Sequence, residues 1–302
     1  MSKQTPPPAP LDLRQMAIHT ITTKPWPIET AIDRYARAGF GGISIWREAM
    51  EGRTPAVIRR QLNEANLTGV SLVRGGFIAH RESAAQKSAL EDNRRCIEEA
   101  EALGLPLIVL VCGADPAWSL RESRARIAEA LVTLAPEAAA AGVRLGIEPL
   151  HPMYADTRSA VNTLAQANEI ARQVNAAVSG SATPGAAPSA TASVPTVCSV
   201  VDVYHLWWDP ALQQEIAGAG RDNLLGAFHV CDWRVPTEHM LLDRGLMGEG
   251  CIDIPLIRSW VEEAGFRGPD HLTEVEIFSE RYWAMDQDQW LEMIREACRT
   301  AV

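Results

Sequence analysis

The chain has 302 residues, with 28 Lys or Arg against 38 Asp or Glu, and its formal charge is −10 at neutral pH. A hydrophobic fraction of 47% is that of a globular protein with a sizeable core. Because a net acidic chain repels phosphate backbones and anionic lipid head groups, we expect neither a nucleic-acid partner nor a membrane partner.

The N-terminal segment is rich in proline and has no apolar stretch before a small-residue cleavage site. We therefore expect residues 1–12 to form a flexible arm, and we expect no secretory signal and a cytoplasmic location. The folded part would then be residues 13–302. The strongest apolar run, at 105–112, is much shorter than the ~20 residues that cross a bilayer.

Short apolar runs recur along the whole chain, separated by segments with helical periodicity. The predicted strands, in chain order, are 16–20, 42–46, 69–76, 106–113, 143–149, 196–202, 224–232 and 271–278. Helical patterns between them include Ile28, Ile32 and Tyr35 before Gly39; a Thr54 cap with Pro55; Ile127, Leu131 and Leu134; and Leu256, Ile257, Trp260 and Val261 before Gly265.

Length alone allows either two domains of roughly 150 residues or one α/β barrel of roughly 250. Eight strand–helix units with nearly continuous apolar strands predict a closed parallel sheet covered by helices, which is a single (β/α)8 TIM barrel. The alternative is an open doubly wound sheet. That fold would normally carry a glycine-rich turn after its first strand, and no GxGxxG follows residues 16–20.

Two further features concern the chain's organisation. The Ala/Ser/Thr/Pro/Gly tract at 178–195 cannot bury a core and predicts a disordered loop inside the barrel. Six cysteines are scattered without a CxxC pair, which indicates reduced and mostly buried thiols and not disulfides or a thiolate zinc site.

Ionisable residues end or interrupt four apolar strands in the second half of the chain, namely Glu148, Asp202, His229 and either Glu274 or Glu276. In a parallel barrel such strand ends meet at the catalytic face. Any one of these acids alone would more often be a helix cap or an ion-pair partner. Together they form an oxygen-rich set that suits one divalent ion, with Mn²⁺ favoured and Mg²⁺, Co²⁺ or Zn²⁺ as alternatives.

The strings GIEPLHP, VVDVYHLWWDP, AFHVCDW, DRGLMGEGCIDIP and EVEIFS resemble the xylose-isomerase-like sugar phosphate isomerase/epimerase superfamily. This group includes ketose 3-epimerases, inosose dehydratases, hydroxypyruvate isomerases and endonuclease IV. The resemblance implies metal ligands at Glu148, Asp202, His229 and Glu276, with Glu148 and Glu276 as the acid/base pair. It favours Glu276 over Glu274 because EIF is similar to the family's pattern after the last strand.

The chemistry implied is proton abstraction next to a carbonyl through an enediolate, whose charge a chelated metal stabilises. Two glutamates on opposite sides of a sugar would epimerise or isomerise it. Loss of a β-hydroxyl from an inosose or 3-keto sugar, by a dehydratase or lyase, remains an alternative. So does a barrel that has lost catalysis and serves as a binding subunit.

Several other polar or aromatic residues follow strands and are expected near the site. We expect the substrate to contact His19, Trp46, His151, His205 and Arg244, and Asp232 to orient His229. For the loop histidines the alternative is a bond to backbone, and for Arg244 it is simple solvation. The acidic loop at 243–250 offers no phosphate cradle, which favours an unphosphorylated sugar or polyol as the small-molecule partner.

A nuclease of the endonuclease IV type is the least favoured reading. Those enzymes carry an Asp-Arg-His ligand pair where this chain has Asp243, Arg244 and Gly245. The acidic charge also opposes DNA binding. Whether the protein forms a homo-oligomer is left open by the sequence.

Overall fold

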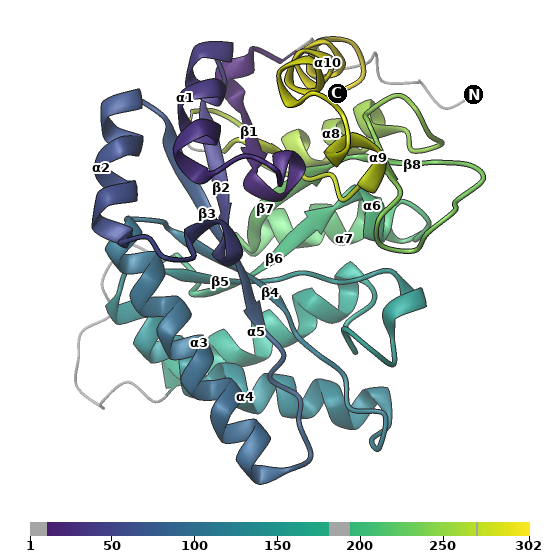
Figure 1. The fold of residues 1–302 in the computed structure, drawn as a ribbon. Coiled ribbons are helices and arrows are strands. Elements are labelled where there is room, and N and C mark those ends of the chain that lie inside the picture. The colour runs from purple at the N-terminus through teal and green to yellow at the C-terminus, as the bar shows by residue number, and fades with distance from the viewer. Residues whose placement is uncertain (1–10, 181–193, 270) are drawn as a thin grey trace.

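The computed structural model describes residues 11–180, 194–269 and 271–302, and it confirms the single closed parallel barrel (Figure 1). The order of strands around the barrel is β1-β10-β7-β6-β5-β4-β3-β2. All eight predicted strands are present: β1 (Met16–His19), β2 (Gly42–Trp46), β3 (Thr68–Gly76), β4 (Leu107–Val111), β5 (Arg144–Ile147), β6 (Val197–Asp202), β7 (Leu225–Val230) and β10 (Thr273–Val275).

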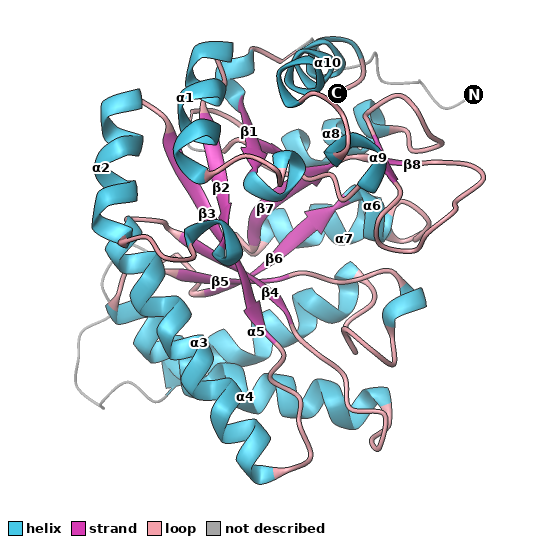
Figure 2. Cartoon of the chain, in the orientation of Figure 1, coloured by secondary structure: helices cyan, strands magenta, loops and turns pink. Residues whose placement is uncertain are grey.

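Helices surround the strands on the outside (Figure 2). They are α1 (Ile28–Ala38), α2 (Pro55–Ala65), α3 (Ser83–Leu103), α4 (Leu120–Ala140), α5 (Leu164–Gly180), α6 (Val203–Leu206), α7 (Leu212–Arg221), α8 (Ile254–Glu263), α9 (Glu280–Trp283) and α10 (Gln287–Thr300). Four short 3₁₀ helices are η1 (Leu13–Gln15), η2 (Thr20–Thr23), η3 (Arg47–Met50) and η4 (Pro152–Tyr154). A two-stranded antiparallel ladder joins β8 (Asp232–Trp233) to β9 (Arg244–Gly245).

The apolar strands are buried on both faces, as a parallel sheet requires. Every residue of β1, β2, β4, β6 and β10 is buried. Outward-facing strand residues pack against the helices. A separate apolar cluster includes Val109, Val200 and Ala227, with Trp46 and Phe278 at one end. The barrel interior is therefore a packed core, and ligands have access only at its ends.

The helix ends follow the sequence signals closely. Gly39 terminates α1 in the left-handed conformation, with φ of +91°. Pro55 begins α2, although the Thr54 side chain makes no capping hydrogen bond. The predicted loop at 178–195 needs one correction, because α5 continues as a helix to Gly180. Residues 181–193 of that loop lie outside the described residues.

The predicted arm at 1–12 also falls mostly outside the described residues. Its last residue, Asp12, accepts a hydrogen bond from the backbone N–H of Arg14 at 2.9 Å and caps η1.

The six cysteines are unpaired, and all except Cys251 are buried. None of the helices in the described ranges combines the length and the apolar composition that a membrane span requires.

Gly76 closes β3 with φ of +108°, and a Cβ there would lie 2.0 Å from the carbonyl oxygen of Val111 on β4. Gly39 has a similar φ, but nothing lies within 4 Å of its Cβ position. We expect Gly39→Ala to lower the free energy of unfolding by about 1 kcal/mol from backbone strain alone. Gly76→Ala should cost at least about 3 kcal/mol because the clash is added. Urea denaturation measures both, and equal losses would contradict this account of β3.

Candidate metal centre

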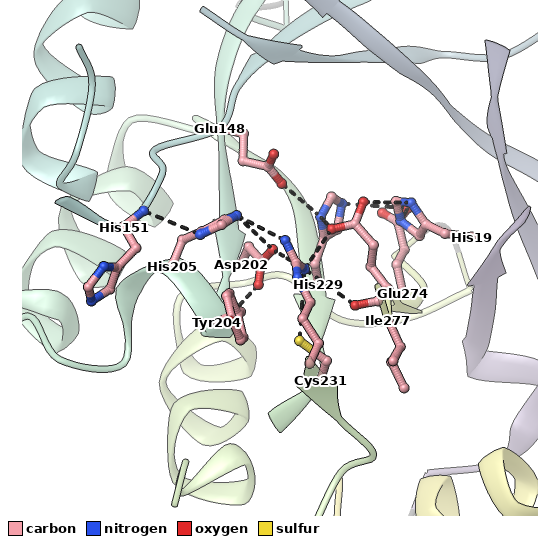
Figure 3. A network of polar contacts seen from close by, with 12 residues as sticks. His19, Glu148, His151, Asp202, Tyr204, His205, His229, Cys231, Glu274 and Ile277 are labelled. Atoms are coloured by element: carbon pink, nitrogen blue, oxygen red, sulfur yellow. Dashed lines mark hydrogen bonds and ion pairs between the residues drawn. The ribbon is translucent and has the colours of Figure 1, made fainter. Parts of the chain in front are cut away.

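Four predicted ligands converge at the C-terminal ends of consecutive barrel strands. Figure 3 shows three of them, Glu148, Asp202 and His229. Glu148 follows β5, Asp202 ends β6, His229 lies on β7 and Glu276 follows β10. One ligand atom from each of the four lies within 4.8 Å of all the others, and all four residues are buried. The parallel register produces this convergence, since Asp202 pairs with His229 across β6 and β7.

Glu274 and Glu276 point to the same side of the strand, because alternate residues share a face, but they lie at different depths in the barrel. The Glu274 Oε2 accepts hydrogen bonds from the hydroxyls of Ser44 and Ser71, at 2.5 and 3.2 Å. It also lies 3.8 Å from His229 Nε2. Glu276 is therefore the member of the four-residue cluster, whereas Glu274 sits behind His229 and can hold its ring in place.

The charges of the cluster are unbalanced toward the negative. Burial raises the pKa of Asp202 to about 7. Arg244 acts to lower this pKa, but repulsion from Glu148 and Glu276 acts to raise it. Although burial disfavours its charged form, the surrounding carboxylates, led by Glu274, raise the pKa of His229 to about 10. Raised pKa values at both Asp202 and His229 mean that the buried cluster favours added positive charge. A divalent cation would supply that positive charge, so the donor set fits the predicted metal.

Arg244 supplies one positive charge to this cluster. Its Nη1 lies 3.1 Å from Asp202 Oδ2 and 3.0 Å from Glu276 Oε2, and its side chain is 3% exposed. The guanidinium also lies 4.5 Å from the ring centre of Tyr204. The alternative of a solvated arginine in a flexible loop is therefore wrong, because β9 pairs with β8 and carries Arg244 inward.

His19 lies beneath the cluster and contacts both C-terminal glutamates. Its Nε2 is 3.0 Å from Glu274 Oε2, and its Nδ1 is 3.1 Å from Glu276 Oε1. Although burial acts against it, interaction with Glu276 raises the pKa of His19. His19 is fully buried and lies against Glu276, where it can support that carboxylate, and its contact with the substrate stays a prediction. Trp46 donates its indole N–H to His19 and does line a cavity.

His205 and His151 form a chain leading away from Arg244. His205 Nε2 lies 3.0 Å from Arg244 Nη2, and His205 Nδ1 accepts the backbone N–H of His151 at 3.2 Å. Burial and the neighbouring guanidinium hold the pKa of His205 well below its usual range, which keeps it neutral. The His151 ring accepts the backbone N–H of Met153 and packs 5.0 Å from Trp233. The backbone-bonded alternative thus describes His151, while His205 faces the cluster.

Asp232 does not orient His229 as expected. Its carboxylate oxygens accept backbone N–H groups from Trp233, Gly248 and Ile252, at 2.8, 2.9 and 3.0 Å. The reason is that β7 ends at Val230 and the chain turns outward, so that Asp232 faces the following loop. Asp232 therefore shapes residues 246–252, which follow the strand that carries Arg244.

Two tyrosines that the sequence analysis did not single out hold a loop over the site. The hydroxyls of Tyr154 and Tyr204 both donate to the carbonyl oxygen of Met240, at 2.6 and 3.1 Å. An ion pair between Arg234 and Asp243 closes the base of the same loop. Tyr204 lies two residues after Asp202, and this proximity was the one available signal. Its partner, however, is a backbone oxygen that no side-chain pattern reveals.

Comparison with known proteins assigns the family. A model described as the xylose isomerase-like TIM barrel matches residues 32–185 and 186–299, so the chain belongs to this family. No curated protein matches the chain.

Solved structures support the same fold. Protein SMc04130 from Sinorhizobium meliloti 1021 is 35% identical, with a TM-score of 0.86 over 96% of this chain and 98% of its own. The IolI protein, solved with a bound zinc atom, is 18% identical with a TM-score of 0.77, over 93% and 95% of the two chains. A D-psicose 3-epimerase, solved in the presence of D-fructose, is 16% identical with a TM-score of 0.69, over 93% and 96%. The low identity of the last two supports the shared fold alone.

The two glutamates of β10 provide a direct test of the metal centre. We expect Glu276→Gln to weaken Mn²⁺ binding by about 100-fold, because a charged ligand is lost. Glu274→Gln should weaken it by about tenfold or less, because only support for the His229 ring is lost. Calorimetric titration with Mn²⁺ measures both affinities, and circular dichroism checks folding. A greater loss for Glu274→Gln would reverse the assignment of the fourth ligand.

Proposed function

We propose that this protein is a divalent-metal-dependent sugar isomerase or epimerase that acts through an enediolate. The observation that carries the proposal is the buried cluster of Glu148, Asp202, His229 and Glu276, whose ligand atoms lie within 4.8 Å of one another. Such a cluster at the C-terminal face of a parallel barrel is where this architecture holds its chemistry. A bound divalent ion would act as a Lewis acid toward the negative charge that develops on the substrate oxygens.

Mn²⁺ is the ion we propose. Three carboxylates and one imidazole form a hard donor set, and the cluster contains no thiolate. The zinc reported in the IolI structure shows that a barrel of this fold accepts a divalent ion. The D-fructose present with the D-psicose 3-epimerase supports a ketose as the substrate class.

Glu148 and Glu276 are the proposed acid/base pair. They come from β5 and β10, which are separated around the barrel by the strands that carry Asp202 and His229. A substrate held between them would meet one carboxylate on each side, so one can remove a proton and the other can return it. Arg244 and His19 contact Glu276, and both hold its pKa well below its usual range even though burial raises it. This keeps Glu276 ionised, as a base requires.

Neutral His205 and the Arg244 guanidinium are proposed to bind substrate oxygens beside this pair. Both lie within 3.8 Å of Asp202 Oδ2, so they are at the edge of the ligand cluster. The Arg244 guanidinium would donate hydrogen bonds to a developing oxyanion, while neutral His205, whose Nδ1 accepts from the His151 backbone and whose Nε2 faces Arg244, would add no competing charge.

Incubation with Mn²⁺ and a panel of ketoses in D₂O, followed by NMR, tests the reaction. We expect deuterium at the carbon next to the carbonyl. Deuterium at carbon three with a new epimer would identify an epimerase, and deuterium at carbon one or two would identify an isomerase. Loss of water would instead favour the dehydratase alternative, and no exchange with any ketose would favour a non-catalytic barrel.

Metal removal should abolish this exchange reversibly. After treatment with EDTA we expect the rate to fall at least about 1,000-fold, because the enediolate charge loses its stabilisation. Added Mn²⁺ should restore the rate. Exchange that persists in metal-free protein, verified by elemental analysis, would contradict metal dependence.

Replacing either proposed acid/base residue should remove exchange. Glu148→Gln and Glu276→Gln are each expected to lower kcat by about 100-fold to 10,000-fold, the usual contribution of a positioned acid or base. Glu101→Gln, an exposed carboxylate on α3, is the control and should leave kcat unchanged. Wild-type rates in a metal-loaded Glu148→Gln protein would exclude Glu148 from proton transfer.

A further inference from the structure

A cavity of about 560 Å³ lies near the metal-ligand cluster, although none of the four proposed ligands lines it. Trp46 and Phe278 form part of its wall, and their rings lie 5.0 Å apart. Trp46 donates to His19, which contacts Glu276, and Phe278 follows Glu276 by two residues in the chain. One layer of side chains therefore separates the cavity wall from the proposed acid/base carboxylate.

The wall of this cavity is cationic, in contrast to the protein as a whole. Its charged residues are Lys24, Arg53, Arg74 and Arg158 against the single acid Glu48. Arg53 is already paired, since its guanidinium lies 3.0 Å from Glu29. Lys24 is exposed and lies 4.7 Å above the Trp283 ring. Arg74 and Arg158 remain, and we refer to them as the arginine pair.

Each member of the arginine pair rests on an aromatic ring instead of on a carboxylate. Arg74 lies 4.6 Å from the ring centre of Phe77, and Arg158 lies 5.9 Å from that of Tyr154. Within the described ranges no ion pair joins either guanidinium to an acid. Both side chains are half-buried, so water screens their charges only in part.

The charge of Arg158 also acts against the charged form of Arg74. Burial and the charge of Arg158 lower the pKa of Arg74, and the opposite effect of Glu48 does not offset them. Like charges at a cavity whose wall carries one acid, Glu48, are costly, and an anion that contacts both of them relieves part of that cost. Arginine is also the side chain whose planar donors match the oxygens of a carboxylate or phosphate.

We propose that the arginine pair binds an anionic group of the substrate, either a carboxylate or a phosphate monoester, while the nearby metal-ligand cluster acts on the carbonyl end. The inference rests on the proposed function for its second half only. A phosphate monoester would depart from the expectation of an unphosphorylated sugar or polyol, which considered the acidic loop at 243–250. The binding charge comes instead from β3 and from the segment after η4.

Calorimetric titration of the full-length protein as purified tests the anion site. Inorganic phosphate and glycolate are the probes, because they carry the two anionic groups without any particular sugar. We expect saturable binding of at least one of them, with a Kd of about 1 mM, that weakens as NaCl is added. Preference for phosphate or for glycolate distinguishes a sugar phosphate from a sugar acid. Absence of saturable binding of both would overturn the proposal.

Substitutions then locate the site. Arg74→Met and Arg158→Met should each weaken the preferred anion at least tenfold, because a charge-assisted hydrogen bond is lost. Arg53→Met is the matched control: Arg53 lines the same cavity but is paired with Glu29, and its loss should change Kd less than twofold. Arg74→Lys keeps the charge and should retain part of the affinity. An equal loss in Arg53→Met would overturn the assignment to the arginine pair.

The outcome of the anion-binding experiment is distinguishable from the outcome of the deuterium-exchange experiment. Anion binding that depends on Arg74 and Arg158, in a protein that exchanges no deuterium into any ketose, would contradict the proposed reaction and leave the anion site standing. Exchange into neutral ketoses without anion binding would support the proposed reaction and contradict the anion site.

Discussion

The cost of burying carboxylates at the end of an apolar barrel shapes the rest of the site. Glu148, Asp202 and Glu276 lie among strands whose remaining residues are almost all hydrophobic, and unpaired charges there would cost several kcal/mol each. Two neighbouring cationic or protonatable side chains, Arg244 and His19, contact these carboxylates. Arg244 lies between Asp202 and Glu276, and His19 lies between the two glutamates of β10. Burial raises the pKa of Asp202 even with Arg244 beside it, and the neighbouring carboxylates add to that effect.

The loops above the barrel keep this arrangement in place. Asp232 accepts three backbone N–H groups and so defines the loop that follows Arg244. Tyr154 and Tyr204 hold the carbonyl oxygen of Met240 over the same region. Removing water from around the cluster strengthens its electrostatic interactions, since the effective dielectric falls. In the proposed reaction these loop contacts would lower the dielectric around the cluster without supplying one of its four ligand atoms.

The net charge of the chain does not describe the charge of the cavity near the metal-ligand cluster. The chain carries a charge of −10, yet the cavity near the metal-ligand cluster has a cationic wall. The excess of acids over the whole chain disfavours polyanions, whereas the proposed anion site would take a ligand small enough to enter the cavity. A small anion and a large one therefore experience opposite fields.

The sequence by itself determined the barrel, because burial on both faces makes parallel strands readable as apolar runs. It also pointed to the four proposed ligands, because a polar residue that ends such a run in a parallel barrel lies at the barrel's C-terminal face. It also favoured Glu276 over Glu274, but only through a resemblance. The tertiary structure decided the depth of those two glutamates, the burial of Arg244, the loop-shaping position of Asp232 and the meeting of Arg74 with Arg158. Each of these depends on contacts between segments far apart in the chain. Such contacts exist only once the eight strands have closed into a ring, and no local pattern of residues encodes them.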